Sequence, residues 1–132
     1  MIAIDTNVIV RFLVRDDELQ AEIVRRRLKQ AESSRERLFI PLLVTLETIW
    51  VLESAYDKTR SEILDAIQTM RQMPVFDFEA DEAVERLLND GPKYKADLSD
   101  ILIAHSAQTS GCESGITFDK GAAKLPFFSL LE

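Results

Sequence analysis

The chain alternates short apolar runs with longer stretches in which apolar residues recur every three or four positions. The short runs predict strands, because buried strands are brief and continuously apolar. They lie at residues 1–4, 37–42, 74–78, 114–119 and 127–131. The periodic stretches predict one or two helices over residues 6–32, and single helices over 44–56, 59–73, 79–90 and 97–111.

Strands that alternate with helices predict an α/β fold. Because connections of this kind join parallel strands, we expect a short, mostly parallel central sheet with helices on both faces, a three-layer α/β/α arrangement. The length of 132 residues suits one domain spanning residues 1–132. A second domain is not needed, and the sequence contains no evident repeat or linker.

Composition narrows the class of protein. Apolar residues make up 46% and charged residues 30% of the chain, which is typical of a globular domain. The net charge of -7 argues against a broad basic surface for nonspecific nucleic-acid binding. The longest apolar runs are far shorter than the roughly 20 residues that cross a membrane. We therefore expect no membrane contact and a cytoplasmic protein, and the single Cys112 is compatible with that compartment.

Two acids follow predicted strands directly. Asp5 ends the run MIAI, and Asp119 ends the run GITF. The carboxyl ends of parallel strands form the edge of an α/β sheet where ligands bind, so both carboxylates are candidate site residues. The alternative is that each acid caps a turn or helix, which aspartate does often.

Two further acids interrupt apolar helix faces. Glu47 has Leu43, Val44, Trp50 and Val51 as its helical neighbours, which predicts a carboxylate buried on an apolar face. Such a group needs a partner, which could be a metal ion, an arginine or a lysine.

Asp100 repeats this pattern on the helix over residues 97–111, where small alanines are among its neighbours. Asp97 lies one turn earlier. Its first interpretation is the N-cap of that helix in a capping box with Asp100, and its second is a further ligand.

Carboxylates that converge repel one another unless cations neutralise them. Oxygen ligands, with no cysteine pair and a single histidine, select hard ions such as Mg²⁺ or Mn²⁺. Such ions activate water and stabilise phosphoryl displacement, which indicates phosphodiester hydrolysis.

At this point the chain resembles the PIN-domain ribonucleases, and in order and spacing the VapC-like toxins of toxin–antitoxin operons. The motifs are IDTN at 4–7, Glu47 in VTLETIWVL, ADLSDILIAHSA at 96–107 and GITFDKGAAKL at 115–125. The resemblance runs from Met1 to about Leu131. It implies a PIN-like fold and a Mg²⁺-dependent endoribonuclease, with Mn²⁺ as a substitute. Its further implications are an RNA substrate and a cognate antitoxin that covers the site, and we also predict a homodimer.

The resemblance also assigns residues. The acidic quartet of catalytic and metal-binding residues is Asp5, Glu47, Asp100 and Asp119, with Asp97 as a possible addition. Thr6, Asn7 and Thr117 match the polar residues beside the first and last acids, where they would hydrogen-bond the ligands. Candidate RNA phosphate contacts are Arg11, Arg15, Lys93, Lys95, Lys120 and Lys124, each of which could equally be a solvated surface charge.

Two rival functions use the same residues. A phosphatase or phosphoryl-transfer enzyme would use Asp5 as its nucleophile, although such enzymes usually carry a second acid where this chain has Asn7. A catalytically silent module would use the same fold to bind RNA or protein. Trapping a phosphoryl adduct on Asp5 would support the first, and absence of carboxylate-dependent Mn²⁺ binding would support the second.

Overall fold

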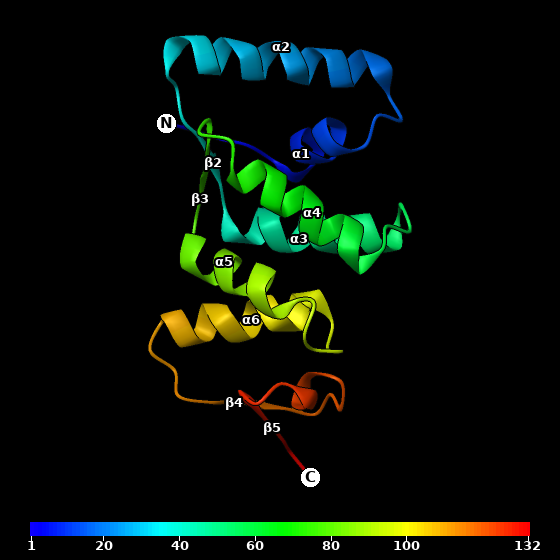
Figure 1. Cartoon of the computed structure of the whole chain (residues 1–132), viewed down its shortest axis with the longest axis vertical. Coiled ribbons are helices and arrows are strands. Elements are labelled where there is room, and N and C mark those ends of the chain that lie inside the picture. The colour runs from blue at the N-terminus through cyan, green and yellow to red at the C-terminus, as the bar shows by residue number, and fades with distance from the viewer.

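The computed structural model describes residues 1–132 and contains six α-helices, five short strands and one 3-10 helix (Figure 1). The helices are α1 (Thr6–Leu13), α2 (Glu18–Ser34), α3 (Leu42–Ser54), α4 (Arg60–Arg71), α5 (Asp81–Asp90) and α6 (Leu98–Thr109). The strands are β1 (Ile2–Ala3), β2 (Leu38–Ile40), β3 (Phe76–Phe78), β4 (Gly115–Thr117) and β5 (Phe128–Leu130), with the 3-10 helix η1 (Ala122–Lys124) before β5. The predicted α/β fold is confirmed.

Local chemistry explains where the helices begin and end. Asp17 starts α2 by accepting the Gln20 backbone N–H at 3.0 Å, so residues 6–32 contain two helices rather than one. Thr59 and Glu62 form a capping box at the start of α4. Gly91 caps α5 at its C-terminus and is followed by Pro92, which cannot continue the helix.

All strand pairs are parallel, but they form two sheets. The first has the order β1-β2-β3, and the second pairs β4 with β5. Figure 1 shows an elongated molecule with α2 at one end, and with β4, β5 and the C-terminus at the other. The strands that precede Asp5 and Asp119 therefore belong to different sheets.

The prediction of a buried first strand is wrong. Ile2 and Ala3 are both exposed, whereas Phe76 and Phe78 of β3, the other edge strand, are buried, so the elements that cover β3 do not cover β1. An apolar run cannot distinguish an edge strand from a central one, since hydrophobic residues also occupy surface positions.

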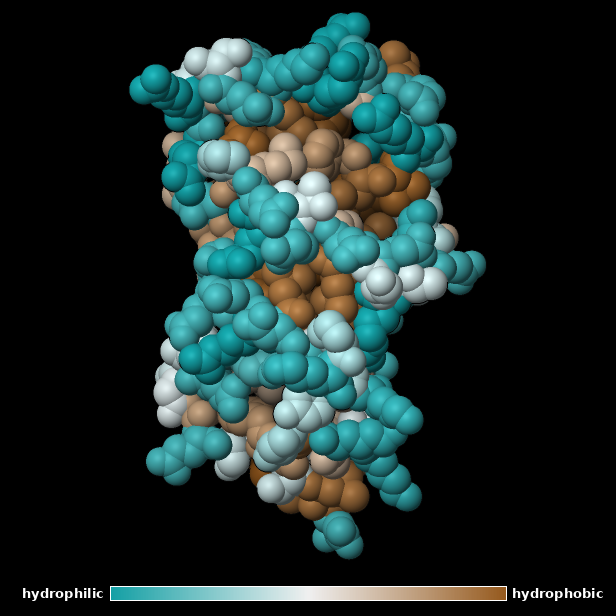
Figure 2. All heavy atoms as spheres, viewed as in Figure 1, coloured by the Kyte–Doolittle hydropathy of each residue, from teal (hydrophilic) through white to brown (hydrophobic).

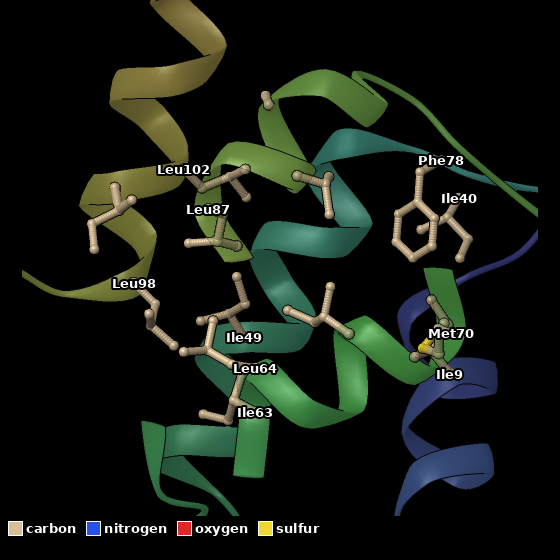
Figure 3. Close-up of a cluster of buried hydrophobic side chains, with 14 of the residues drawn as sticks. Ile9, Ile40, Ile49, Ile63, Leu64, Met70, Phe78, Leu87, Leu98 and Leu102 are labelled. Carbon is tan, nitrogen blue, oxygen red and sulfur yellow. The ribbon is translucent and has the colours of Figure 1, made fainter. Parts of the chain in front are cut away.

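The hydrophobic core lies mainly between helices α3, α4, α5 and α6. Ile49, Ile63, Leu87 and Ile101 are fully buried, one from each of these helices. Figure 3 shows Ile49, Leu64 and Leu87 pointing toward one another from three of the helices. The apolar face of α4 therefore belongs to this core and is not free to form a dimer contact.

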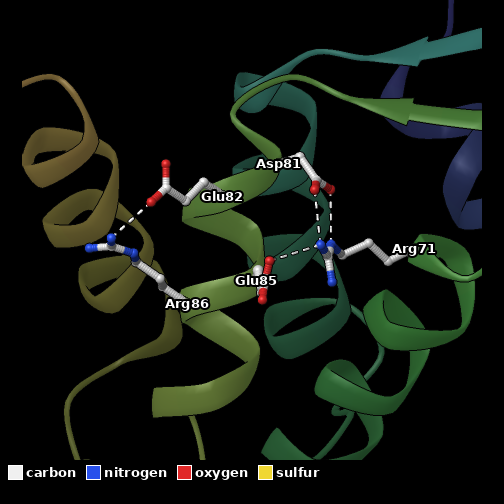
Figure 4. A network of polar contacts seen from close by, with 5 residues as sticks. All are labelled: Arg71, Asp81, Glu82, Glu85 and Arg86. Atoms are coloured by element: carbon white, nitrogen blue, oxygen red, sulfur yellow. Dashed lines mark hydrogen bonds and ion pairs between the residues drawn. The ribbon is translucent and has the colours of Figure 1, made fainter.

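An ion-pair network also joins α4 to α5. The Arg71 guanidinium contacts Asp81 at 2.9 Å and Glu85 at 3.2 Å, and Figure 4 shows it between the two helices. The neighbouring pair of Arg86 with Glu82 lies within α5 alone. Of these two sets of ion pairs, the Arg71 network is the one that ties two helices together.

The surface is mostly hydrophilic, with hydrophobic residues reaching it in a few places (Figure 2). One of these lies at the end of the molecule that carries the C-terminal strands, where Ile116 and Phe118 are exposed. None of the helices combines the length and the apolar character that crossing a membrane requires.

Candidate functional site

Three carboxylates lie near one another where α6 begins. Asp97 is the N-cap of α6, Asp100 lies in its first turn, and Asp119 comes from the loop after β4. Partial burial, followed by the nearby charges of Asp119 and Asp97, raises the pKa of the Asp100 carboxyl. The fold thus brings an acid from the end of the chain to the acids of α6.

Asp97 occupies the predicted N-cap position but makes no side-chain capping bond. Its backbone carbonyl alone bonds to the helix, by accepting the Ile101 N–H at 3.1 Å. Its carboxylate remains exposed and available to another partner. The expected capping box with Asp100 is therefore not formed.

A second pair of acids lies at the start of α1 and on α3. Asp5 is the N-cap of α1, and its Oδ1 accepts the Thr6 backbone N–H at 2.7 Å. The buried Thr6 hydroxyl donates a hydrogen bond to Glu47 Oε1. Thr6 therefore connects the first strand end to the acid of α3, and the hydroxyl serves Glu47 rather than Asp5.

The prediction that Glu47 is buried is wrong. The Glu47 side chain is exposed, as are its neighbours Leu43 and Trp50. The apolar face on which it was placed is real, but it faces solvent beside α6 instead of the core. Helical spacing identifies residues that share a face and does not say what covers that face.

A groove lies between α3 and α6. Glu47 lines it from α3 together with Trp50, and Ser99 lines it from α6 next to Asp100. As the side chains stand, no three of the His, Cys, Asp and Glu residues are grouped closely enough to hold one metal ion. The acids therefore do not form a finished coordination shell.

The donor set nevertheless fits a hard divalent cation in its chemistry. All the candidate ligands are carboxylate oxygens, which suit Mg²⁺ and Mn²⁺. Burial, and then repulsion from the charges of Asp119 and Asp97, raises the pKa of the Asp100 carboxyl, and no Lys or Arg side chain opposes this shift. A bound cation would remove that repulsion.

The polar residues beside the acids have distinct roles. Thr117 accepts the Asp119 backbone N–H at 2.9 Å through its hydroxyl, so it orients the backbone and not the carboxylate. Asp119 Oδ1 in turn accepts the Gly121 N–H at 2.7 Å, the capping role considered as its alternative. Its second oxygen makes no such bond. Asn7 is exposed and makes no side-chain hydrogen bond.

The basic candidates divide into two groups. Arg11 is engaged, since its guanidinium bonds Gln20 at 2.7 Å, Asp16 at 3.0 Å and the Tyr56 hydroxyl at 3.1 Å. The remaining candidates are exposed and form no ion pairs, namely Arg15, Lys93, Lys95, Lys120 and Lys124.

His105 lies apart from the acids. Its ring nitrogens contact Asp90 at 2.7 Å and Gln108 at 2.9 Å, which fixes α6 against the end of α5. His105 therefore has a structural role.

Glu53 is a further acid near the site, which the spacing of residues did not single out. It lies near the end of α3 and lines a hollow with Arg60 and Asp97. Partial burial and the Asp97 charge raise the pKa of Glu53, and the Arg60 charge opposes this. Its position six residues after Glu47 places it on another side of the helix, so only the packing of α3 on α6 brings it near Asp97.

Comparison with known proteins agrees with this arrangement. The family model described as the PIN domain matches residues 2–128. A VapC ribonuclease from Aquifex aeolicus (strain VF5) is 24% identical to the chain over 124 residues, which cover 94% of this chain and 91% of that protein. Because the family match covers nearly the whole chain, and the fold supplies the parallel strands and acid-bearing helices described above, the protein belongs to the PIN domain family.

Proposed function

We propose that this protein is a metal-dependent endoribonuclease, the toxin of a VapBC-like toxin–antitoxin pair. The observation that carries the proposal is the meeting of Asp97, Asp100 and Asp119 at the start of α6 in a PIN domain. The similarity to a VapC ribonuclease over 94% of the chain supports the choice of RNA as the substrate.

In this proposal Asp5, Glu47, Asp100 and Asp119 would hold Mg²⁺ or Mn²⁺, with Asp97 as an additional candidate. A bound ion of this kind lowers the pKa of water and stabilises negative charge on a phosphate. The protein's own contribution is orientation, since Thr6 holds Glu47 by a hydrogen bond and the turn at Gly121 holds Asp119. Asp100 would bind the cation through its charged carboxylate, the form that a bound cation favours.

RNA would be held by the basic residues around this region. Lys93 and Lys95 precede α6, and Lys120 and Lys124 follow Asp119, all with exposed side chains. Ammonium groups near a metal site bind phosphates and position the strand without reading its sequence. Four such lysines would provide a local basic rim on a protein whose net charge is -7.

The partner in the cell would be a small antitoxin protein that covers the acids. We further propose a homodimer, supported by the unpartnered apolar residues on α3 and α6. Leu43, Trp50 and Ile103 are all exposed, so α3 carries apolar residues on its outer face as well as on its buried face. Helices of that composition are usually covered on every side.

Sequencing of RNA ends after brief induction tests the proposed activity. Wild-type protein should stop growth and produce new internal RNA ends, and the Asp5→Asn variant at equal abundance should do neither. Coexpression of the adjacent upstream reading frame should restore growth. New ends that persist in the Asp5→Asn variant would reject the acidic site, and failure of the coexpressed frame to rescue growth would count against the toxin assignment.

A further inference from the structure

Arg60, the first residue of α4, reaches across to the segment that leads from α5 into α6. Its Nη1 donates to the Gly91 carbonyl oxygen at 2.8 Å and to that of Tyr94 at 3.1 Å. Its Nη2 donates to the carbonyl oxygen of Ala96. One guanidinium thus satisfies three backbone acceptors in residues 91–96, which we call the approach segment.

The approach segment lies tightly against the helices at its two ends. Gly91 is buried, and a Cβ there would stand 2.8 Å from Leu64 Cδ1, so the backbone runs directly against α4. Ala96 is 1% exposed at the other end. Lys93 and Lys95 between them are exposed. The approach segment is therefore held by the hydrogen bonds of Arg60 and by the packing of Gly91 and Ala96 at its two ends.

The last of these hydrogen bonds is made next to the candidate site. Ala96 directly precedes Asp97, whose own carbonyl accepts the Ile101 N–H and so begins the first turn of α6. Asp100 lies in that same turn. A displacement of the Ala96 carbonyl would therefore move both acids as a unit. The planar, rigid fork of an arginine suits this task better than a flexible ammonium does.

We propose that Arg60 is a positioning residue for the acids of α6. By holding the approach segment, it fixes the place at which Asp97 and Asp100 face Asp119 across the site. Arg60 does not touch the reacting atoms in this account. Its effect on metal binding rests on the proposed function, whereas its effect on the approach segment does not.

The test compares three variants with the wild type: Arg60→Gln, Arg60→Lys and, as a matched control, Lys58→Gln. Lys58 lines the same hollow as Arg60 and Asp97, so its removal changes the charge there without breaking the bonds to the approach segment. Amide hydrogen exchange over residues 91–101 reports the segment directly. The electron paramagnetic resonance signal of free Mn²⁺ gives the metal affinity, and RNA cleavage at saturating Mn²⁺ gives kcat.

We expect Arg60→Gln to accelerate exchange at the amides of Lys93 and Tyr94, which bond the Asp90 carbonyl, and to weaken Mn²⁺ binding about tenfold. Arg60→Lys should fall between this variant and the wild type. At saturating Mn²⁺ the kcat of Arg60→Gln should recover most of the wild-type value, because excess metal compensates for misplaced ligands. Lys58→Gln should match the wild type in exchange and affinity.

Wild-type exchange and Mn²⁺ affinity in both Arg60 variants would overturn the inference. An equal loss of affinity in Lys58→Gln would overturn it too, because charge and not the hydrogen bonds would then be responsible. If Arg60→Gln does not fold, Arg60→Lys alone decides, since one ammonium cannot reproduce the fork. A wild type that binds no Mn²⁺ would reject the proposed function instead, and exchange would still decide whether Arg60 holds the segment.

Discussion

Thr6 is a buried residue whose hydroxyl has one evident task, to orient Glu47. Thr6→Val keeps the shape and removes the hydrogen bond. We expect the free energy of unfolding to change by only about 1 kcal/mol, as for a typical single hydrogen bond. Mn²⁺ affinity should fall about tenfold, as for other residues that orient metal ligands. Isothermal titration with Mn²⁺ and urea unfolding measure the two quantities.

Thr45→Val is the matched control for this prediction. Thr45 is equally buried on α3, but its hydroxyl has no partner. Replacing it with valine should leave Mn²⁺ affinity unchanged and should not lower stability. Equal Mn²⁺ affinities in the Thr6 and Thr45 variants would contradict the orienting role of Thr6.

The Asp100 carboxylate, although proposed as a metal ligand, is expected to lower the stability of the metal-free protein. Its pKa is raised in the folded protein by burial and then by Asp119 and Asp97, so the charged form destabilises the fold above the folded pKa. This penalty disappears as the pH falls through that pKa. Asp100→Asn should therefore raise the urea midpoint of the metal-free protein at pH 7, and the difference from wild type should shrink toward pH 4. A less stable Asp100→Asn variant at pH 7 would contradict the assigned cause of the shift.

At the scale of elements, the Arg71 network should contribute stability that acid removes. The hydrogen bond from Arg71 lowers the pKa of Asp81, so this contribution is present above the unfolded pKa of about 3.9 and is lost as the pH falls through the folded pKa. Arg71→Gln should lower the free energy of unfolding by about 1 kcal/mol at pH 7, because Asp81 and Glu85 are largely exposed.

Urea unfolding at pH 7 and pH 3 measures this effect, with Arg86→Gln as the control. Arg86 contacts only Glu82 within its own helix, so its loss should cost less at pH 7. The gap between Arg71→Gln and wild type should be smaller at pH 3. A gap that does not depend on pH would mean that Arg71 stabilises the protein by packing alone.

The elements themselves were largely predictable because their signals are local. Thr59 with Glu62, and Gly91 with Pro92, mark helix ends that the structure reproduces within a few residues. The exposure of β1 and the outward-facing Glu47 were not predictable, because both depend on which elements pack beside them. For the same reason the sequence does not predict that Glu53, Arg60 and Asp97 line one hollow.

At the scale of the whole molecule, the exposed apolar residues of α3 and α6 predict self-association. Trp50→Glu replaces an aromatic side chain that is 64% exposed, so it should leave the fold intact in the monomer. A charge placed at the centre of an apolar interface should instead prevent a dimer. Light scattering after size exclusion should give a dimer for wild type and a monomer for the variant. A monomeric wild type would reject the proposed homodimer.

The division of the acids between α1, α3, α6 and the loop after β4 means that the activity depends on the fold as a whole. The most direct test is cleavage of a structured RNA by purified protein with Mn²⁺, with EDTA, and with Asp100→Asn in place of the wild type. We predict internal cleavage by the wild type that EDTA abolishes and that Asp100→Asn, although folded, does not perform. Cleavage that continues in EDTA, or that is equal in the Asp100→Asn variant, would contradict the proposal of a metal-dependent site built on these acids.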